Sequence, residues 1–451
     1  MSVKIDIQIG TPFLPAEAPI RLVGVLATIK VGKGSPLPLR LGIVVDKSES
    51  MLIPIVSQEV FERLQAEGKL RQGRRDGVGV WEILGAPPPE LSQAPRAIDS
   101  VKEALRQIVE RLGPNDQFFL VAFATQARTV IPLTASRERR AILSQLDQLE
   151  RLELGRETRL APALSEALRQ VSSLDRAGIV DRWVILTDGF AEDESDCRVV
   201  VAKASEQGIG ISTVGLGAQF NDDLMVSIAD ETGGNAEWAP TINEIPQVLA
   251  KEFEEVRKAS LARAHLLLKV TQGVEIRRGW KVRPVVASLP FVSHGERTFA
   301  ANLGDLGAGE EVQLLLELLA PPRKEGTFRL AQIALEWRDR YGQQTSQPVD
   351  IVVSYTTDPT RLAARSLEVL RAMEAVTAAD LQTRALRDLQ RGEVEGATRK
   401  LQAAATRLLN LGKDRQAQEV QQMAESLQRT GSAPSEETKK IRYQTRRLTP
   451  P

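Results

Sequence analysis

Residues Leu41–Met51 have the sequence LGIVVDKSESM, and this stretch decides the fold. It opens with a short apolar run, Leu41–Val45, which gives way abruptly to polar residues. Runs that are this short, continuously apolar and rich in β-branched side chains are typical of a parallel strand buried on both faces. Open α/β sheets bind their ligands just beyond the carboxyl ends of such strands. We therefore expect the polar residues after Val45 to lie at a ligand site.

Asp46, Ser48 and Ser50 place one carboxylate and two hydroxyl groups at every second position of this polar run. Hard oxygen donors of this kind suit Mg²⁺ or Mn²⁺, and no His or Cys is nearby to indicate zinc. The alternative is a turn that closes the strand, in which these side chains hydrogen-bond their own backbone. The stretch by itself leaves both interpretations open.

The composition excludes several classes of protein. The chain has 451 residues, which predicts two or three domains, and its 59 basic residues balance its 59 acidic ones. A net charge of zero gives no general attraction to nucleic acid or to anionic membranes. Cys197 is the only cysteine, so no internal disulfide can form and a reducing compartment is natural. The first residues lack the apolar core of a secretory signal, and no window approaches the roughly 18 apolar residues of a membrane span. We expect a cytoplasmic protein.

Residues 37–257 alternate between strand-like and helix-like segments, which predicts an α/β domain with a doubly wound, Rossmann-like and mostly parallel sheet. Segment 52–95 interrupts the alternation immediately after the polar run, and we interpret it as an insertion beside the site. Apolar runs typical of buried strands lie at Leu41–Val45, Phe118–Ala124, Arg182–Thr187 and Gly210–Gly217.

The pattern changes on both sides of this domain. Residues 258–356 consist of strand-like segments separated by Gly, Pro and Asp turns, which predicts an all-β sandwich. Residues 1–36 hold two further strand-like segments that lack partners of their own, so we expect them to complete the sandwich. The α/β domain is then an insertion within it. Residues 357–451 are helical throughout, and we expect their basic tail, TKKIRYQTRRLTPP, to be solvated and loosely held.

Two residues further along the chain complete the site. Thr158 precedes a helix in LGRETRLAPAL, and Asp188 follows a buried strand in WVILTDGF. In a doubly wound sheet, both loops gather at the crevice beside Asp46. One site would then hold two carboxylates and three hydroxyls.

The runs DKSESM and ILTDG, together with Thr158, resemble the metal-ion-dependent adhesion site of von Willebrand factor A domains, and the resemblance covers roughly residues 40–256. It implies a site for Mg²⁺, or else Mn²⁺ or Ca²⁺, with an Asp or Glu of a protein partner filling an open position. The implied metal ligands are Asp46, Ser48, Ser50, Thr158 and Asp188. The residues expected to contact the partner are Met51, Glu157, Arg159, Gly189 and Phe190.

Two features depart from that family's pattern. The family usually has Gly-Gly-Thr or a similar sequence where this chain has Gly155-Arg156-Glu157-Thr158. Glu157 either approaches the metal or faces solvent, and we favour solvent. The second departure is the 52–95 insertion, where the family passes directly into its first helix. A lid or a specificity element is the favoured interpretation, because loops around that face select partners.

The resemblance and the residues favour a non-enzymatic scaffold for metal-dependent protein–protein interactions. The main rival is a phosphoryl-transfer hydrolase that uses Asp46, but haloacid-dehalogenase-type enzymes need a second Asp where this chain has Ser48. A third interpretation is an adaptor whose metal is only structural. The order of modules resembles both the Sec23/Sec24 coat proteins and stand-alone bacterial A-domain proteins of the cytoplasm. The bacterial resemblance implies partners such as ATPase chaperones or kinase-signalling components.

Overall fold

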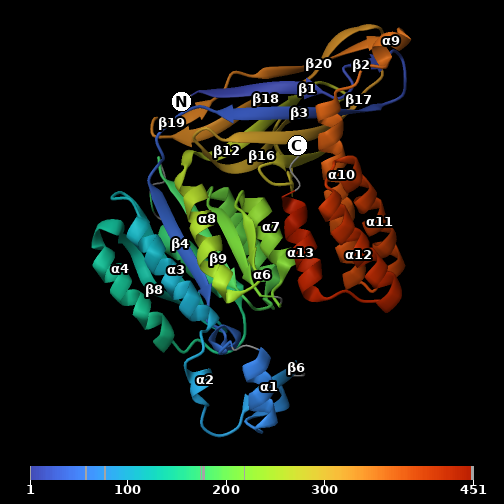
Figure 1. Ribbon diagram of the computed structural model, residues 1–451. Helices are drawn as coiled ribbons and strands as arrows, with labels where there is room; N and C mark the ends of the chain where they lie inside the picture. The colour runs from blue at the N-terminus through green and yellow to red at the C-terminus, as the bar shows by residue number, and fades with distance from the viewer. Residues whose placement is uncertain are drawn as a thin grey trace.

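The computed structural model describes residues 2–55, 58–75, 78–172, 174, 178–217 and 219–447. Figure 1 shows a β-sandwich above an α/β domain, a bundle of helices beside both, and a small subdomain that projects from the far end of the α/β domain. Among the described residues, no helix combines the length and the apolar character that crossing a membrane requires.

A six-stranded sheet forms the centre of the α/β domain, in the order β11-β10-β9-β4-β7-β8. The opening stretch supplies β4, which pairs in parallel with β7 on one side and with β9 on the other. Every residue of β4 is buried, as expected for a strand covered on both faces. Only β8 runs antiparallel to its neighbour. The strands are β4 (Leu39–Asp46), β7 (Gln117–Phe123), β8 (Ala127–Ala135), β9 (Val180–Thr187), β10 (Gly210–Leu216) and β11 (Ala236–Ala239).

Helices cover both faces of this sheet, which confirms the predicted doubly wound α/β fold. One core cluster joins α3, α4 and α8 to the sheet, and a second joins α5, α6 and α7 to its other face. The first group is α3 (Ala97–Arg111), α4 (Arg139–Leu146) and α8 (Ile245–Arg257), with 3₁₀ turns η2 (Ser136–Glu138), η3 (Asp147–Arg151) and η4 (Ile242–Glu244). The second is α5 (Leu160–Val171), α6 (Glu194–Glu206) and α7 (Asp222–Thr232).

The β-sandwich is built from both sides of the insertion, as the sequence predicted. Strand β3 (Arg21–Val31) pairs with β17 (Glu311–Ala320) along ten residues of each, so the N-terminal strands lie within the later sheet. The first sheet has the order β1-β3-β17-β13-β14, and the second β15-β16-β12-β18-β20-β2, with β19 beside β18. The remaining strands are β1 (Val3–Ile9), β2 (Phe13–Pro15), β12 (Ala259–Val270), β13 (Glu275–Arg283), β14 (Ala287–Ser288), β15 (Val292–Gly295), β16 (Thr298–Gly307), β18 (Gly326–Asp339), β19 (Gly342–Thr345) and β20 (Val349–Thr356).

The C-terminal region is all-helical, as predicted, and packs against the sandwich. A Cβ placed on Gly24 of β3 would lie 3.0 Å from the sulfur of Met373 and 3.2 Å from a methyl carbon of Val369. The missing side chain therefore lets α10 approach the sheet closely. The helices are α9 (Pro359–Leu362), α10 (Leu367–Gln390), α11 (Val394–Asn410), α12 (Asp414–Thr430) and α13 (Ser435–Arg446).

The expectation of a loosely held basic tail is wrong for the residues up to Arg447. Helix α13 lies against α7 and β11 of the α/β domain (Figure 1). Its residue Arg446 pairs with Asp230 at 2.6 Å, and Arg447 pairs with Glu237 at 2.5 Å. The Tyr443 ring is buried and stacks on Trp238. The basic residues that the pattern assigned to solvent have acidic partners about 200 positions earlier in the chain.

The 52–95 insertion forms a small subdomain beyond the carboxyl edge of the central sheet (Figure 1). Its strands β5 and β6 make a separate two-stranded sheet. Leu64, Leu70 and Leu91 form its own small core. The two segments that connect this subdomain to the α/β domain are joined by a hydrogen bond from the Ile55 N–H to the Pro95 carbonyl at 3.0 Å. Its elements are α1 (Gln58–Ala66), β5 (Leu70–Arg75), β6 (Val78–Ile83) and α2 (Pro89–Ser92), after the 3₁₀ turn η1 (Glu49–Leu52).

Candidate metal centre

The carboxyl ends of two neighbouring strands carry the candidate site. Asp46 is the last residue of β4, and Asp188 directly follows the last residue of β9, which is Thr187. Because β4 and β9 are paired in parallel, with Val45 opposite Leu186, the two carboxylates reach the same edge of the sheet. The third loop comes from the N-terminal end of α5, where Thr158 stands.

Asp46 is fully buried, and two hydrogen bonds fix its carboxylate. One oxygen accepts from the backbone N–H of Ser48 at 2.8 Å, and the other accepts from the hydroxyl of Thr187 at 2.6 Å. The bond from the Ser48 N–H is the side-chain-to-backbone hydrogen bond expected if this stretch is simply a turn that closes the strand. The turn and a ligand site are compatible here, because the hydrogen bond within the turn orients the Asp46 carboxylate.

Serine hydroxyls connect the β4 loop to the β9 loop. The Ser48 and Ser50 hydroxyl oxygens are 3.0 Å apart, and the Ser50 hydroxyl donates to Asp188 at 2.7 Å. Ser48 is buried, whereas Ser50 is exposed. The predicted serines thus form one hydrogen-bonded path from the first loop to the second carboxylate, and this path opens toward solvent.

Thr158 joins the group through its contact with Gly189. A Cβ placed on Gly189 would lie only 2.2 Å from the Thr158 hydroxyl oxygen, so that oxygen occupies the space that a side chain would need. The predicted site residues Asp46, Ser48, Ser50, Thr158 and Asp188 are therefore brought together from three loops. Gly189, which is also expected to contact a partner, leaves the space that the Thr158 side chain occupies.

Burial and like charge dominate the electrostatics of the two carboxylates. Burial, followed by the negative charge of Asp46, raises the pKa of Asp188 to about 7. Burial also raises the pKa of Asp46, against hydrogen bonds from Thr187 and Ser48 that lower it. Neither carboxylate pairs with a Lys or Arg in the part of the chain that the structure describes. Two adjacent carboxylates, one buried and one half-buried, that have no basic partner are stabilised by a bound cation.

The donor set fits a hard divalent cation. In the described ranges, no cluster of three or more His, Cys, Asp or Glu side chains has metal-binding geometry. An ion at this edge would therefore be held by two carboxylates and by the hydroxyls of Ser48, Ser50 and Thr158. All of these donors are oxygen atoms, which suits Mg²⁺, Mn²⁺ or Ca²⁺ rather than zinc.

Residues 92–251 match the family model of the von Willebrand factor type A domain. The α/β part of this chain is a von Willebrand factor A domain. The match begins in the last residues of the insertion, so β4 and its polar run lie outside it, although β4 is central to the sheet of the A domain. Residues 367–451 match a second family model, described as the Sll0103-like, C-terminal alpha-helical domain.

Two bacterial proteins are similar to this chain over more than half of its length. A Synechocystis protein described as uncharacterised protein sll0103 is 25% identical over 321 residues, which covers 68% of this chain and 74% of that protein. Escherichia coli YfbK, also described as uncharacterised, is 25% identical over 270 residues, which covers 54% of this chain and 45% of its own length.

Solved structures reproduce the whole arrangement of modules. A von Willebrand factor type A protein from Catenulispora acidiphila superposes with a TM-score of 0.76 at 16% identity, covering 98% of this chain and 96% of that one. The ArnB paralog VWA2 from Sulfolobus acidocaldarius superposes with a TM-score of 0.60 at 13% identity, covering 100% and 99%. At these identities the likeness concerns the fold.

The flanking residues of the A-domain site divide into exposed and buried ones. Phe190 is 64% exposed, and Glu157 and Arg159 are also exposed. The backbone N–H of Glu157 donates to the Thr125 hydroxyl at 3.1 Å, which holds this loop while its carboxylate faces solvent. Met51 is 0% exposed, because the 3₁₀ turn after Ser48 directs it into the core. The expectation that Met51 contacts a partner is therefore wrong.

Two residues that position the site were not predicted from the sequence. Thr187 orients Asp46, and Asp193 fixes the loop that carries Thr158. Both oxygens of the buried Asp193 carboxylate accept backbone hydrogen bonds at the start of α5, from Leu160 at 3.0 Å and from Ala161 at 2.8 Å. Asp193 directly precedes α6, so its position predicts a cap for that helix. Local sequence contains no signal that it caps a different helix.

Proposed function

We propose that the A domain is a divalent-metal-dependent protein-interaction module that binds an Asp or Glu side chain of a protein partner. The observation that carries the proposal is the pair of the buried Asp46 and the half-buried Asp188, two carboxylates that have no basic partner among the described residues, at an edge of the sheet that is open to solvent. Related A domains commonly bind a divalent metal and mediate protein interactions, which supports the same function here.

Each residue has a distinct part in this proposal. Asp46 and Asp188 supply the negative charge, and Ser48, Ser50 and Thr158 supply neutral oxygens. A divalent ion bound to so few carboxylates keeps positive charge, which attracts a carboxylate from outside. Because Thr187 already orients Asp46, the site needs little rearrangement to accept the ion. The exposed Phe190, Glu157 and Arg159 then flank the incoming side chain.

Calorimetric titration of Mg²⁺, Mn²⁺ and Ca²⁺ tests the metal. We expect saturable heats with the wild-type protein, none with Asp46→Asn, and wild-type behaviour with the control Glu138→Gln, whose side chain is exposed and outside the site. Circular dichroism verifies that each variant is folded. Equal heats for Asp46→Asn and wild type contradict the proposed site.

Co-purification from lysate of the source cells, in Mg²⁺ or in EDTA, tests the interaction. The proposal expects partners that are lost in EDTA and lost with Asp46→Asn. Partners retained in both would favour the alternative that the metal only holds the loops together. Sustained phosphate-ester hydrolysis that Asp46→Asn abolishes would favour the hydrolase alternative. The ATPase chaperones and kinase-signalling components implied by family resemblance, and the cytoplasmic location, stay predictions.

A further inference from the structure

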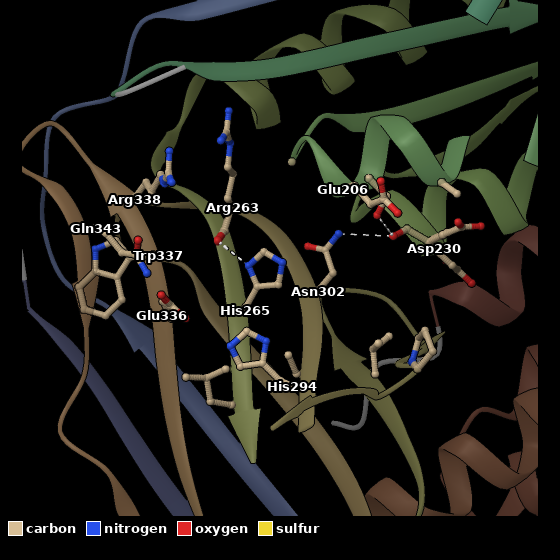
Figure 2. Close-up of a pocket in the computed structure, with 18 residues that line it drawn as sticks. Glu206, Asp230, Arg263, His265, His294, Asn302, Glu336, Trp337, Arg338 and Gln343 are labelled. Atoms are coloured by element: carbon tan, nitrogen blue, oxygen red, sulfur yellow. Dashed lines mark hydrogen bonds between the residues drawn. The ribbon is translucent and has the colours of Figure 1, made fainter. Parts of the chain in front are cut away.

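A second site lies at the opposite end of the A domain from the metal centre. A cavity of about 600 Å³ opens between the A domain and the sandwich (Figure 2). One wall comes from the ends of α6 and α7, close to where β10 begins, whereas the metal centre lies where the strands end. The other wall is the outer face of the sheet that contains β12 and β16. The volume is within the range of ligand sites in proteins, about 300–1,000 Å³.

The floor of this cavity is an apolar row across three strands. Leu267 of β12 is paired with Ala300 of β16, and Ala300 is paired with Val292 of β15. Paired residues of neighbouring strands point to the same face of the sheet. All three line the cavity, and Val292 is 68% exposed. The row provides a surface for the apolar part of a ligand.

Both histidines of the chain line this cavity, and one has a defined acceptor. Nδ1 of His265 lies 2.9 Å from the carbonyl oxygen of Arg263. A carbonyl oxygen only accepts, so Nδ1 carries the proton and the neutral ring keeps Nε2 as an acceptor. Because Ala264 and Leu266 are buried in the sandwich core, His265 points to the opposite, cavity-facing side of β12 (Figure 2). His294 lies on the same wall.

Three carboxylates add negative charge to the walls. Glu206, Glu231 and Glu336 make no ion pair or side-chain hydrogen bond with any other residue in the described part of the chain. Burial raises the pKa of Glu231, despite the attraction of Arg198.

The other charged groups in the lining are mostly neutralised by partners. Asp230 pairs with Arg446 at 2.6 Å, and Arg263 pairs with Asp181 at 3.7 Å. Arg338 lies at the exposed rim of the cavity. In the described lining, the three glutamates without an ion-pair partner therefore outnumber the arginines without one.

We propose that this cavity binds an organic cation, a protonated amine or guanidinium carried on an apolar chain. The apolar chain lies on the Leu267–Ala300–Val292 row, and the cationic head donates to the carboxylates and to Nε2 of His265. A free amine and the side chain of a Lys or Arg in a peptide both have this chemistry. The site is independent of the metal-dependent function proposed above.

The chain offers a clean probe, because its only two histidines both line this cavity. Imidazole ¹H–¹³C NMR spectra are recorded on the full-length protein in EDTA, during titration with pentylamine, 1-pentanol or pentanoate at pH 7. A peptide, acetyl-Leu-Lys-Leu-amide, represents the side-chain source. Single His→Gln variants assign the two signals. We expect saturable shifts with pentylamine, with the peptide or with both, and weaker effects with the alcohol and the carboxylate.

A double variant, Glu231→Gln with Glu336→Gln, is expected to weaken cation binding about tenfold, since charge-assisted hydrogen bonds are lost. Glu138→Gln, outside the cavity, is the matched control, and retained dispersion of the two imidazole signals verifies folding. Binding of the peptide alone identifies a partner's side chain as the source, and binding of the amine alone identifies a small molecule. Absence of saturable shifts with either cation, or equal shifts with 1-pentanol, overturns the proposal.

Discussion

Arg442 and Asp222, which lie 220 positions apart in the chain, form an ion pair with an Nη1–Oδ2 distance of 2.7 Å. The same guanidinium also reaches Asp223, and its side chain is only 9% exposed. Lys439, one turn earlier on α13, donates to the Phe220 carbonyl at 2.8 Å and lies over the Phe220 ring. These contacts join the helical domain to α7 of the A domain.

Replacing Arg442 by alanine is expected to lower the free energy of unfolding by about 2 kcal/mol, because Asp222 then keeps only its longer pair with Lys439, at 3.4 Å, and Asp223 loses its ion pair with Arg442. Thermal unfolding measures the loss. The matched control is Arg415→Ala, whose side chain is 89% exposed in its pair with Glu419. A change of at most about 0.5 kcal/mol is expected there. Equal losses in the two variants would show that α13 is not anchored by this pair.

Asp193→Ala is expected to weaken metal binding although Asp193 is outside the donor set. Its carboxylate caps α5 and so holds the loop of Thr158, and loss of a cap costs about 1 kcal/mol of stability. Calorimetry with Mn²⁺ and thermal unfolding measure both effects. Asp196→Ala, an exposed position in the first turn of α6, is expected to change neither. A stability loss with unchanged metal affinity would contradict the positioning role.

Gly189→Ala is expected to abolish metal binding, because its methyl group would overlap the Thr158 hydroxyl and displace it from the site. The double variant Gly189→Ala with Thr158→Ala removes the overlap. It should therefore recover thermal stability without recovering metal binding. Recovery of both in the double variant would show that the hydroxyl is not needed, and full binding in the single variant would show that the loop adapts.

The raised pKa of Asp188 predicts a pH dependence. The ordinary value is 3.8 and the folded value is about 7, so the folded state holds the proton that the unfolded state has already released. Without metal, stability should therefore fall as pH rises from about 4 to about 7, and level off above that. Because metal binds the ionised form, Mg²⁺ affinity should rise over the same interval.

Denaturant unfolding and calorimetry at pH 5, 6, 7 and 8 measure these two trends. Asp188→Asn should reduce the slope of the stability profile between about pH 4 and 7, since an amide does not titrate there, while Asp46, whose pKa burial also raises, still contributes. A profile that is identical in Asp188→Asn and wild type would assign the pH dependence to other groups.

The sequence was sufficient to predict the layers of the fold and the convergence of five oxygen-bearing side chains at one edge of the sheet. Buried parallel strands such as β4 and β9 have a local signature, and the residues that follow them must meet at one edge. The sandwich was predictable for a similar reason, since the strands of residues 1–36 had no partners nearby.

Tertiary contacts explain what the sequence did not predict. Met51 follows a polar run that is typical of a surface, yet one 3₁₀ turn rotates it into the core. The basic residues of α13 are typical of a solvated tail until Asp222, Asp230 and Glu237 are placed opposite them. Asp193 and Thr187 act on groups in other loops, and no spacing rule connects them.

The docking of α13 also limits how these modules can be inherited. Four acidic positions of the A domain, Asp222, Asp223, Asp230 and Glu237, pair with three arginines of the helical domain, Arg442, Arg446 and Arg447. An A domain that lacked those acids would confront Arg442 and Arg446 with a surface unable to neutralise them. Recombination between relatives should therefore exchange the A domain and the helical domain together, as one unit of descent.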